Sequence, residues 1–225
     1  MIRENILTIR EQIKTAAVAA GNNPDDIRLI AVTKTIDEKR ILEALGAGIT
    51  DVGENRVQEL CSKAPLLLPC PTFHLIGHLQ RNKVKEALQY ADYIHSVDSF
   101  RLAEEIQKQA FGFGKQVNVL LQVNTSGEES KFGVAPEELD FLTEQVLKLP
   151  NLKLCGLMTI APKAEYGIDI RSVFADTKSL YERLKEKFLL DLNILSMGMS
   201  NDYIEAISEG ATAVRIGRGI FGERV

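Results

Sequence analysis

Residues 28–34 read Arg28-Leu-Ile-Ala-Val-Thr-Lys34, a mainly apolar run that ends in a lysine. A strand covered on both faces of a parallel sheet loses the alternation of polar and apolar residues, so residues 29–32 predict a buried parallel strand. Lysine is rarely buried unless it is paired. Lys34 therefore either marks the point where the strand reaches solvent or is a desolvated amine suited to forming a Schiff base with a carbonyl compound.

The pattern of a short apolar strand followed by an amphipathic helix recurs along the whole chain. An opening helix with Ile6, Ile9 and Ile13 at helical spacing precedes the first strand. Strands are predicted at residues 28–33, 49–52, 73–76, 93–97, 117–123, 152–158, 194–196 and 212–216. Alternating β and α elements predict a parallel sheet, and eight of them favour a (β/α)8 TIM barrel over an open doubly wound sheet. We expect one α/β domain over residues 1–225, with an extra N-terminal helix.

Composition and charge exclude several classes of protein. The chain has 225 residues, 45% of them hydrophobic, and a net charge of −4, so it can bury one large core but has no basic excess for nucleic acid or a membrane surface. No apolar run approaches the about 18 residues of a membrane helix, and the N-terminus lacks the features of a signal peptide. Cys61, Cys70 and Cys155 match no zinc or redox spacing. We therefore expect a cytoplasmic protein with reduced thiols.

Polar residues lie at or just after the carboxyl ends of the predicted strands. They are Lys34, Asn55, His74, Asn124, Thr159, Ser200 and Arg215. In a TIM barrel these strand ends open onto one face, which holds the active site, so we expect the set to meet there; any single member is equally explained by the polarity of loops. His74 and His78 are four apart, but a strand followed by Gly77 does not place them on one face, and no metal site is predicted.

The loops after the last two predicted strands resemble a phosphate cradle. They read Met197-Gly-Met-Ser200-Asn-Asp and Arg215-Ile-Gly217-Arg218-Gly219. Ser200 is predicted to cap the following helix, and the glycines let backbone N–H groups approach an anion, although a tight turn is the alternative. The pattern G-x-G-x-x-G from Gly217 to Gly222 is not a dinucleotide signature, because only Glu223-Arg-Val225 follow it.

A reactive lysine and a phosphate site suit two kinds of ligand. One is a phosphorylated sugar, as in a class I aldolase; the other is pyridoxal 5′-phosphate (PLP), whose aldehyde reacts with the lysine while the cradle holds its phosphate. Arg215 favours PLP, because an arginine beside the pyridine nitrogen keeps that nitrogen unprotonated, and an aldolase has no such requirement. A salt bridge across the barrel mouth is the alternative role for Arg215.

Five motifs in order along the chain resemble a known family. They are Ala31-Val-Thr-Lys34, Gly53-Glu-Asn55-Arg-Val-Gln-Glu59, His74-Leu-Ile-Gly77-His-Leu-Gln80-Arg-Asn-Lys83, Ser196-Met-Gly-Met-Ser200 and Val214-Arg-Ile-Gly217. The chain is identified by them as a member of the PLP homeostasis proteins, the YggS/PROSC family, and the resemblance covers nearly its whole length. It implies a fold-type III PLP-binding barrel similar to the N-terminal domain of bacterial alanine racemase.

The resemblance also implies roles for individual residues. Lys34 is expected to hold PLP as a Schiff base, and Arg215 to face the pyridine nitrogen. The remaining expected contacts are Asn55 and His74 near the ring, Ser200, Gly217 and Arg218 around the phosphate, and Met199 as a further cofactor-binding residue. Many members of the family have a small or hydroxyl residue at the position of Arg218, so a backbone contact is the alternative to a guanidinium–phosphate bond there.

A racemase of this fold needs a second acid/base group opposite the lysine. Alanine racemases take it from a C-terminal β domain of the partner subunit, which this chain is expected to lack. No tyrosine occupies an evident strand-end position facing Lys34; the five are Tyr90, Tyr93, Tyr166, Tyr181 and Tyr203. We therefore predict a monomeric PLP carrier that takes part in intracellular PLP homeostasis and amino-acid/keto-acid balance, with apo PLP-dependent enzymes as recipients. The alternatives are an active PLP-dependent amino-acid racemase and a PLP-independent Schiff-base aldolase.

Overall fold

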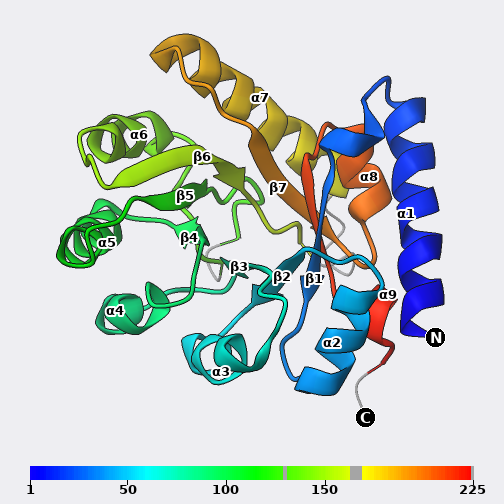
Figure 1. Ribbon diagram of the computed structural model, residues 1–225. Helices are drawn as coiled ribbons and strands as arrows, with labels where there is room; N and C mark the ends of the chain where they lie inside the picture. Colours follow the sequence, from blue (N-terminus) through cyan, green and yellow to red (C-terminus); the bar gives the residue numbers. More distant parts are fainter. Residues whose placement is uncertain (129–130, 163–168, 224–225) are drawn as a thin grey trace.

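A closed parallel barrel is the centre of the fold (Figure 1). The computed structural model describes residues 1–128, 131–162 and 169–223. Within them the strands pair in chain order, and the last strand pairs with the first. The strands are β1 (Arg28–Val32), β2 (Asp51–Glu54), β3 (Thr72–Leu75), β4 (Tyr93–Val97), β5 (Val117–Gln122), β6 (Leu152–Met158), β7 (Ile194–Met199) and β8 (Ala213–Ile216). The predicted (β/α)8 TIM barrel is confirmed.

Helices surround the barrel on its outside (Figure 1). They are α1 (Ile2–Ala19), α2 (Glu38–Gly46), α3 (Val57–Lys63), α4 (Val84–Ala87), α5 (Phe100–Gly112), α6 (Leu139–Leu147), α7 (Ile170–Phe188), α8 (Tyr203–Ser208) and α9 (Arg218–Phe221). The extra N-terminal helix, α1, is confirmed and packs against α8 and α9. The short helix α9 was not predicted, and it begins directly after Gly217, the glycine that follows β8.

Side chains along each strand alternate between two cores. Ala31, Val52 and Phe73 point outward and belong to the large core between barrel and helices. Ile30 and Ile194 point inward and belong to a smaller apolar cluster inside the barrel. Strand pairing sets this alternation, because residues in register on neighbouring strands face the same side. It follows that a residue in register with Ile30, such as Arg215 on β8, also faces the interior.

Two local predictions from the sequence are wrong. Ser200 was expected to cap a helix, but α8 begins at Tyr203 and Asp202 occupies the N-cap position. The second strand was expected at residues 49–52, whereas β2 spans Asp51–Glu54. Residues 51–54 pair in register with residues 72–75 of β3, and Glu54 is buried and paired with a lysine on α3, a contact that strand composition does not reveal. By contrast, Asp37 caps α2 as expected, its carboxylate accepting the Arg40 N–H at 3.0 Å.

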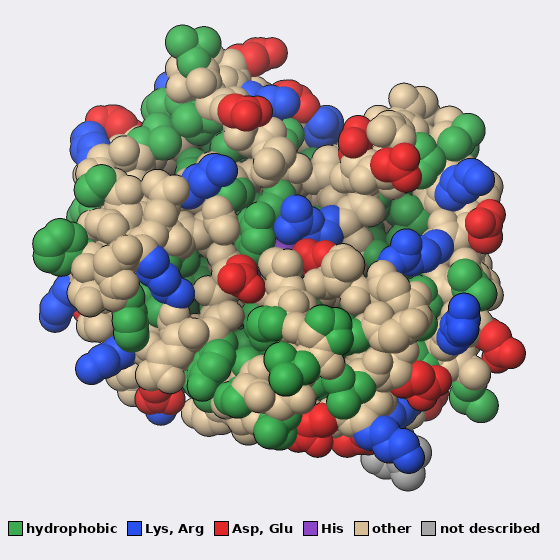
Figure 2. Space-filling model, viewed as in Figure 1, with side chains coloured by type: hydrophobic (Ala, Val, Ile, Leu, Met, Phe, Trp, Pro, Cys, Tyr) green, Lys and Arg blue, Asp and Glu red, His purple; other side chains and the backbone are tan. Residues whose placement is uncertain are grey.

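Charges of both signs are dispersed over the surface. Figure 2 shows lysine and arginine side chains interspersed with aspartate and glutamate, and in the central hollow of this face both signs lie beside a histidine. No continuous basic patch is visible on this face. Within the described ranges, no helix is long and apolar enough to cross a membrane.

Candidate functional site

Five of the predicted site residues line one cavity. Lys34 follows β1, and it shares a cavity of about 440 Å³ with Met199, Ser200, Gly217 and Arg218. These residues come from the carboxyl ends of β1, β7 and β8, which are neighbours in the barrel. A larger cavity of about 690 Å³ runs along the outside of α1 and α8, but its lining is mainly apolar and holds no lysine or arginine. The cavity at Lys34 is therefore the candidate functional site.

Close backbone packing brings the loops after β7 and β8 to Lys34. A Cβ atom on Gly217 would lie 3.3 Å from the carbonyl oxygen of Val32, so the glycine allows the β8 loop to approach the end of β1. The Ser200 hydroxyl accepts the Gly219 N–H at 3.4 Å, which joins the β7 loop to the start of α9. The glycine and the hydroxyl expected in the cradle thus lie together at one cavity, and Ser200 ties two loops together and does not cap α8.

The cavity rim carries charges of both signs. Arg218 has a half-exposed side chain that donates to the Asn201 amide oxygen at 3.2 Å and lies 3.9 Å from the Glu223 carboxylate. The Asp202 carboxylate accepts the Met199 N–H at 2.5 Å, and burial raises the pKa of Asp202. An anion in the cavity would therefore meet a movable guanidinium at the rim and a carboxylate that is already hydrogen-bonded.

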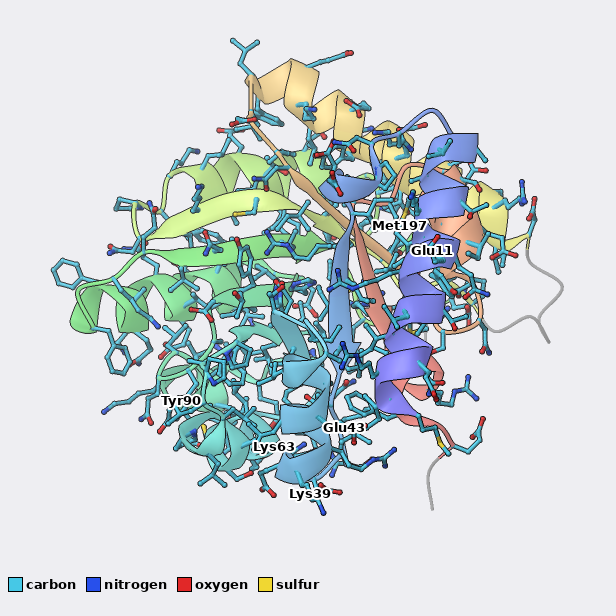
Figure 3. The ribbon with its side chains drawn as sticks, turned by 45° about the vertical axis from the view of Figure 1, so that its right-hand side comes forward. Glu11, Lys39, Glu43, Lys63, Tyr90 and Met197 are labelled. Carbon is cyan, nitrogen blue, oxygen red and sulfur yellow. The ribbon has the colours of Figure 1, made fainter. Side chains whose placement is uncertain are left out.

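A buried ionic group stands behind Lys34 and holds the residue before it. Lys63 comes from α3 (Figure 3), and its Nζ donates to the Thr33 carbonyl at 2.7 Å, the Glu54 carboxylate at 2.8 Å and the Glu59 carboxylate at 2.9 Å. The Thr33 hydroxyl also donates to Glu54, at 2.7 Å. We call Thr33, Glu54, Glu59 and Lys63 the Lys63 cluster. It fixes the end of β1 from which the Lys34 side chain projects.

The residue after Lys34 is held by the same cluster. Thr35 has a φ of +65°, a left-handed conformation that is strained for a β-branched residue. Its N–H donates to the Glu59 carboxylate at 2.7 Å. Burial alone would raise the pKa of Glu59, but the bonds from Thr35 and Lys63 outweigh it and lower that pKa. Burial raises the pKa of Glu54 in spite of its bonds to Lys63 and Thr33.

Arg215 is placed below the cavity, inside the barrel. Its side chain is 3% exposed, with Nη1 donating to the Ser196 hydroxyl at 2.6 Å and Nη2 to the Thr159 carbonyl at 2.8 Å. Burial lowers the pKa of Arg215 to about 10, so the guanidinium stays charged at neutral pH. It forms no ion pair with any described residue, so the alternative of a salt bridge across the barrel mouth finds no support in that part of the chain.

His74 lies within β3 and does not line the cavity. It is completely buried, with Nε2 2.9 Å from the Asp51 carboxylate and Nδ1 2.8 Å from Nε2 of His95. Its ring stacks on Tyr93 at a centroid distance of 4.7 Å. Both ring nitrogens are therefore occupied by protein groups. A direct contact between His74 and a ligand stays a prediction.

Asn55 follows β2 and carries an unsatisfied polar atom. Its Oδ1 is buried and has no hydrogen-bond partner. A Cβ atom on Gly77 would lie 2.1 Å from the Asn55 carbonyl oxygen, so only glycine permits this approach of the β3 loop. Buried polar atoms are nearly always paired, and an unpaired one marks a place where a ligand or water can bind.

The other two strand-end residues serve loop structure: Asn124 donates to the Glu128 carbonyl, and the Thr159 hydroxyl donates to the Val123 carbonyl.

Comparison with known proteins identifies the family. A model of the alanine racemase N-terminal domain matches residues 2–225. A "Pyridoxal phosphate homeostasis protein" of Aquifex aeolicus is 43% identical over 222 residues, covering 98% of this chain and 97% of the relative. One of the same name from Pseudomonas aeruginosa is 44% identical over 229 residues, with 99% and 96% covered. The chain belongs to the pyridoxal phosphate homeostasis protein family. The family predicted from the five motifs is confirmed.

A solved structure supports the same relationship. PipY of Synechococcus elongatus PCC 7942, solved with PLP bound, is 37% identical to this chain and superimposes with a TM-score of 0.86. The match covers 99% of this chain and 100% of PipY. The barrel expected by analogy with the alanine racemase N-terminal domain is thereby confirmed on a close relative.

Sequence reasoning missed the buried groups around this family's cavity. Glu59 and Lys63 are four residues apart on α3, a spacing that a sequence shows but that usually marks a surface ion pair. His95 was not singled out, and Ser196 entered only as part of a family motif. No group of three or more His, Cys, Asp or Glu side chains in the described part of the chain could hold a metal ion.

Proposed function

We propose that this protein binds PLP at the Lys34 cavity and takes part in intracellular PLP homeostasis, and so in amino-acid/keto-acid balance. One observation carries the proposal: a lysine at the end of a barrel strand lines the same cavity as Ser200, Gly217 and Arg218. That set combines an amine with groups that bind phosphate. The names of the relatives and the PLP bound to PipY support the same conclusion.

The donor set fits the chemistry of PLP. The aldehyde of PLP needs a primary amine, the phosphate needs hydroxyl, amide and cationic donors, and the pyridine ring needs polar partners at its edge. Lys34, Ser200 and Arg218 meet the first two needs at one cavity. The unpaired Asn55 amide oxygen marks a free polar position near the end of β2, and either end of an amide can face a ligand.

When bound, PLP supplies an aldehyde that condenses reversibly with a primary amine. The role proposed for the chain is to hold that aldehyde close to Lys34. Ser200, Gly217 and Met199 orient the phosphate end, and Arg218 contributes from the rim by side chain or backbone. Arg215 presents a guanidinium that can only donate hydrogen bonds, which favours an unprotonated pyridine nitrogen. That arrangement favours holding the cofactor over stabilising carbanions on it.

The tyrosines support a carrier over a racemase. Among the described residues that line the cavity, none is a tyrosine. The Tyr181 hydroxyl donates to the Leu192 carbonyl at 2.6 Å, and the Tyr203 hydroxyl donates to Gln12. Tyr166 lies outside the described residues. We propose that the protein stores PLP and delivers it to apo PLP-dependent enzymes in the cytoplasm, where unpaired Cys61, Cys70 and Cys155 would stay reduced. The monomer stays a prediction.

Borohydride reduction followed by peptide mass spectrometry tests the site. Reduction of the PLP-loaded protein is expected to leave a phosphopyridoxyl group on Lys34. The Lys34→Ala variant should lose the adduct, whereas Lys39→Ala, which removes an exposed lysine on α2 (Figure 3), should keep it. An adduct that persists in Lys34→Ala, or that maps to another lysine in the unaltered protein, would refute the assignment.

A second pair of assays separates a carrier from an enzyme. The loaded protein is incubated with each L-amino acid in deuterated water, and exchange at Cα is followed by mass spectrometry. A carrier gives no catalytic exchange but restores the activity of an added apo PLP-dependent enzyme. Multiple-turnover exchange would favour the racemase, and a lysine adduct with a sugar phosphate in place of PLP would favour the aldolase.

A further inference from the structure

A chain of hydrogen bonds crosses the interior of the barrel and ends at Arg215. It begins at the Asp51 carboxylate on β2, which lies 2.9 Å from His74 Nε2 on β3. His74 Nδ1 lies 2.8 Å from His95 Nε2 on β4, and His95 Nδ1 lies 3.1 Å from the Ser196 hydroxyl on β7. Arg215 Nη1 on β8 then donates to that hydroxyl at 2.6 Å. We call these five residues the histidine chain.

The two ends of the histidine chain fix the place of every proton when both rings are neutral. Arg215 has only donors, so the Ser196 oxygen must accept from it, and the single Ser196 proton can then point to an unprotonated His95 Nδ1. Ionised Asp51 has only acceptors, so His74 must carry its proton on Nε2. A neutral His74 then accepts at Nδ1, and His95 must donate from Nε2. With both rings neutral, the two ends therefore fit the same order of protons, in which both rings are protonated on Nε2.

The electrostatics favour the same order. Burial lowers the pKa of His74 in spite of the Asp51 carboxylate, and burial lowers the pKa of His95 well below its usual value. The charged groups that act on the two rings are Arg28, Asp51, Asp92 and Arg215. Hydrogen bonds from His74 and Thr50 outweigh burial and lower the pKa of Asp51. An added proton on His74 Nδ1 would face the Nε2 proton of His95, and one on His95 Nδ1 would force the Ser196 hydroxyl to rotate.

The histidine chain occupies space that barrels usually fill with branched apolar side chains. Burying polar groups costs stability unless they are paired, and here all four ring nitrogens and the Ser196 hydroxyl have partners. Only Asp51, at the far end, reaches a second cavity, of about 480 Å³, which Arg28 also lines. Of the five residues, Arg215 lies closest to the Lys34 cavity, since it is in register with Met199. Arg215 is therefore the residue through which the histidine chain can affect a ligand in the Lys34 cavity.

We propose that Asp51, His74 and His95 act through Ser196 as positioning residues for Arg215, fixing the plane of its guanidinium toward the pyridine nitrogen of PLP. The Ser196 hydroxyl can rotate, and His95 prevents this by accepting its proton. Ser196 then presents its lone pairs to Arg215 Nη1, while the Thr159 carbonyl holds Nη2. This positioning role rests on the proposed PLP site; the order of protons does not.

The protein without PLP provides the first test. ¹⁵N NMR of histidine-labelled protein at pH 7 to 8 is expected to show His74 and His95 as neutral rings protonated on Nε2, with single-site variants providing the assignment. A ring protonated on Nδ1, or a doubly protonated ring at pH 7, would overturn the proposed order of protons in the histidine chain. This measurement needs no cofactor, so its outcome does not depend on whether PLP binds.

Two variants of His95 provide the second test. His95→Leu removes the acceptor for Ser196, whereas His95→Asn keeps an acceptor at the Nδ1 position. His95→Leu is expected to weaken PLP binding about tenfold and to shift the absorbance of bound PLP. His95→Asn should stay within about threefold of the unaltered protein with its spectrum retained. Met158→Leu, a volume-conserving change in the same interior, controls for general disturbance of the barrel.

The outcomes separate the two proposals. If unaltered protein gives no borohydride adduct on Lys34, the proposed function fails, whatever the NMR result. If the adduct forms, and a folded His95→Leu protein binds PLP with unchanged affinity and spectrum, the positioning role fails. Should His95→Leu not fold, Ser196→Ala removes the bridging hydroxyl with little change in volume. It is expected to give the same weakening and the same spectral shift, and an unchanged spectrum would equally overturn the positioning role.

Discussion

The Lys63 cluster and the histidine chain are both buried and polar, yet they are built in opposite ways. The Lys63 cluster concentrates full charges: one ammonium group lies within 2.9 Å of two carboxylates. It is also local in sequence, since Lys63 is nine residues from Glu54 and four from Glu59. The histidine chain uses two neutral rings and a hydroxyl between its charged ends, and His95 and Ser196 are 101 residues apart.

The difference follows from what each system holds in place. The Lys63 cluster supports the backbone on both sides of Lys34, including a strained turn at Thr35, and such support needs strong, short-range bonds. The histidine chain orders a side chain in the middle of the barrel, where extra charges would be costly. We therefore expect the first system to matter most for stability and the second to matter most for the cofactor and for pH dependence.

Lys63→Met should give the largest loss of stability. Removing the ammonium leaves Glu54, with 1% of its side chain exposed, buried without its cationic partner, and the half-buried Glu59 loses the same partner. Breaking a buried ion pair in this way costs about 3–5 kcal/mol in the free energy of unfolding. Denaturation by urea measures the change. Binding of PLP should also weaken, because Thr33 and Thr35 lose support on either side of Lys34.

A matched surface pair supplies the control. Lys148 and Glu144 are also four residues apart on a helix at 2.9 Å, but both side chains are 58% exposed. Lys148→Met should change the free energy of unfolding by less than about 0.5 kcal/mol. Equal losses for Lys63→Met and Lys148→Met would show that burial does not distinguish the two pairs.

The sequence was enough to predict the barrel and part of the cavity, for a physical reason. Lys34, Ser200, Gly217 and Arg218 all follow strands, and the carboxyl ends of parallel strands meet on one face, so the order of elements alone brings these residues together. The family motifs named the same residues. The cavity could thus be assembled without knowing any side-chain contact.

The buried support could not be predicted, because it depends on register and packing. His95 meets His74 only because β3 and β4 are in the register that pairs His74 with Tyr93. Glu54 meets Lys63 only because β2 extends two residues past the predicted end of that strand. Pattern reasoning places elements in order, but it leaves register open by one or two residues, and each residue of shift turns a side chain to the other face.

The histidine chain should give an acid-sensitive stability that the Lys63 cluster lacks. Because the pKa values of His74 and His95 are lowered in the folded protein, the unfolded chain binds more protons as the pH falls below about 6.5. Their contribution is therefore complete above pH 6.5 and is lost below it, with a slope of at most about 1.4 kcal/mol per pH unit for each ring. In the Lys63 cluster, Glu59, whose pKa is lowered, loses its contribution only as the pH falls through the usual glutamate range. Glu54, whose pKa is raised, has the opposite sign and adds stability as the pH falls.

Urea denaturation between pH 7.5 and 5.5 measures this slope. The free energy of unfolding should fall with pH in the unaltered protein and in Met158→Leu. His95→Leu should show a smaller slope, since one ring is absent and its neighbour loses the donor at Nδ1. A slope that is the same in all three proteins would contradict the assignment of the pH dependence to the histidine chain.

Thr35→Gly should give the smallest effect and the sharpest view of how the Lys63 cluster works. A left-handed residue other than glycine carries about 1–2 kcal/mol of strain, and glycine costs about 0.5–1 kcal/mol through the entropy of the unfolded chain. The exposed Thr35 should thus gain about 0.5 kcal/mol of stability as glycine. Leu189, with a φ of +52° and 92% exposed, should gain a similar amount, and it lies outside the Lys63 cluster.

In a Lys63→Met background the turn at Thr35 is no longer held and can relax, so the gain from Thr35→Gly should vanish while that from Leu189→Gly persists. A double-mutant cycle of urea denaturations measures the difference, and an unchanged gain from Thr35→Gly in that background would mean that Lys63 does not maintain the strained turn beside Lys34.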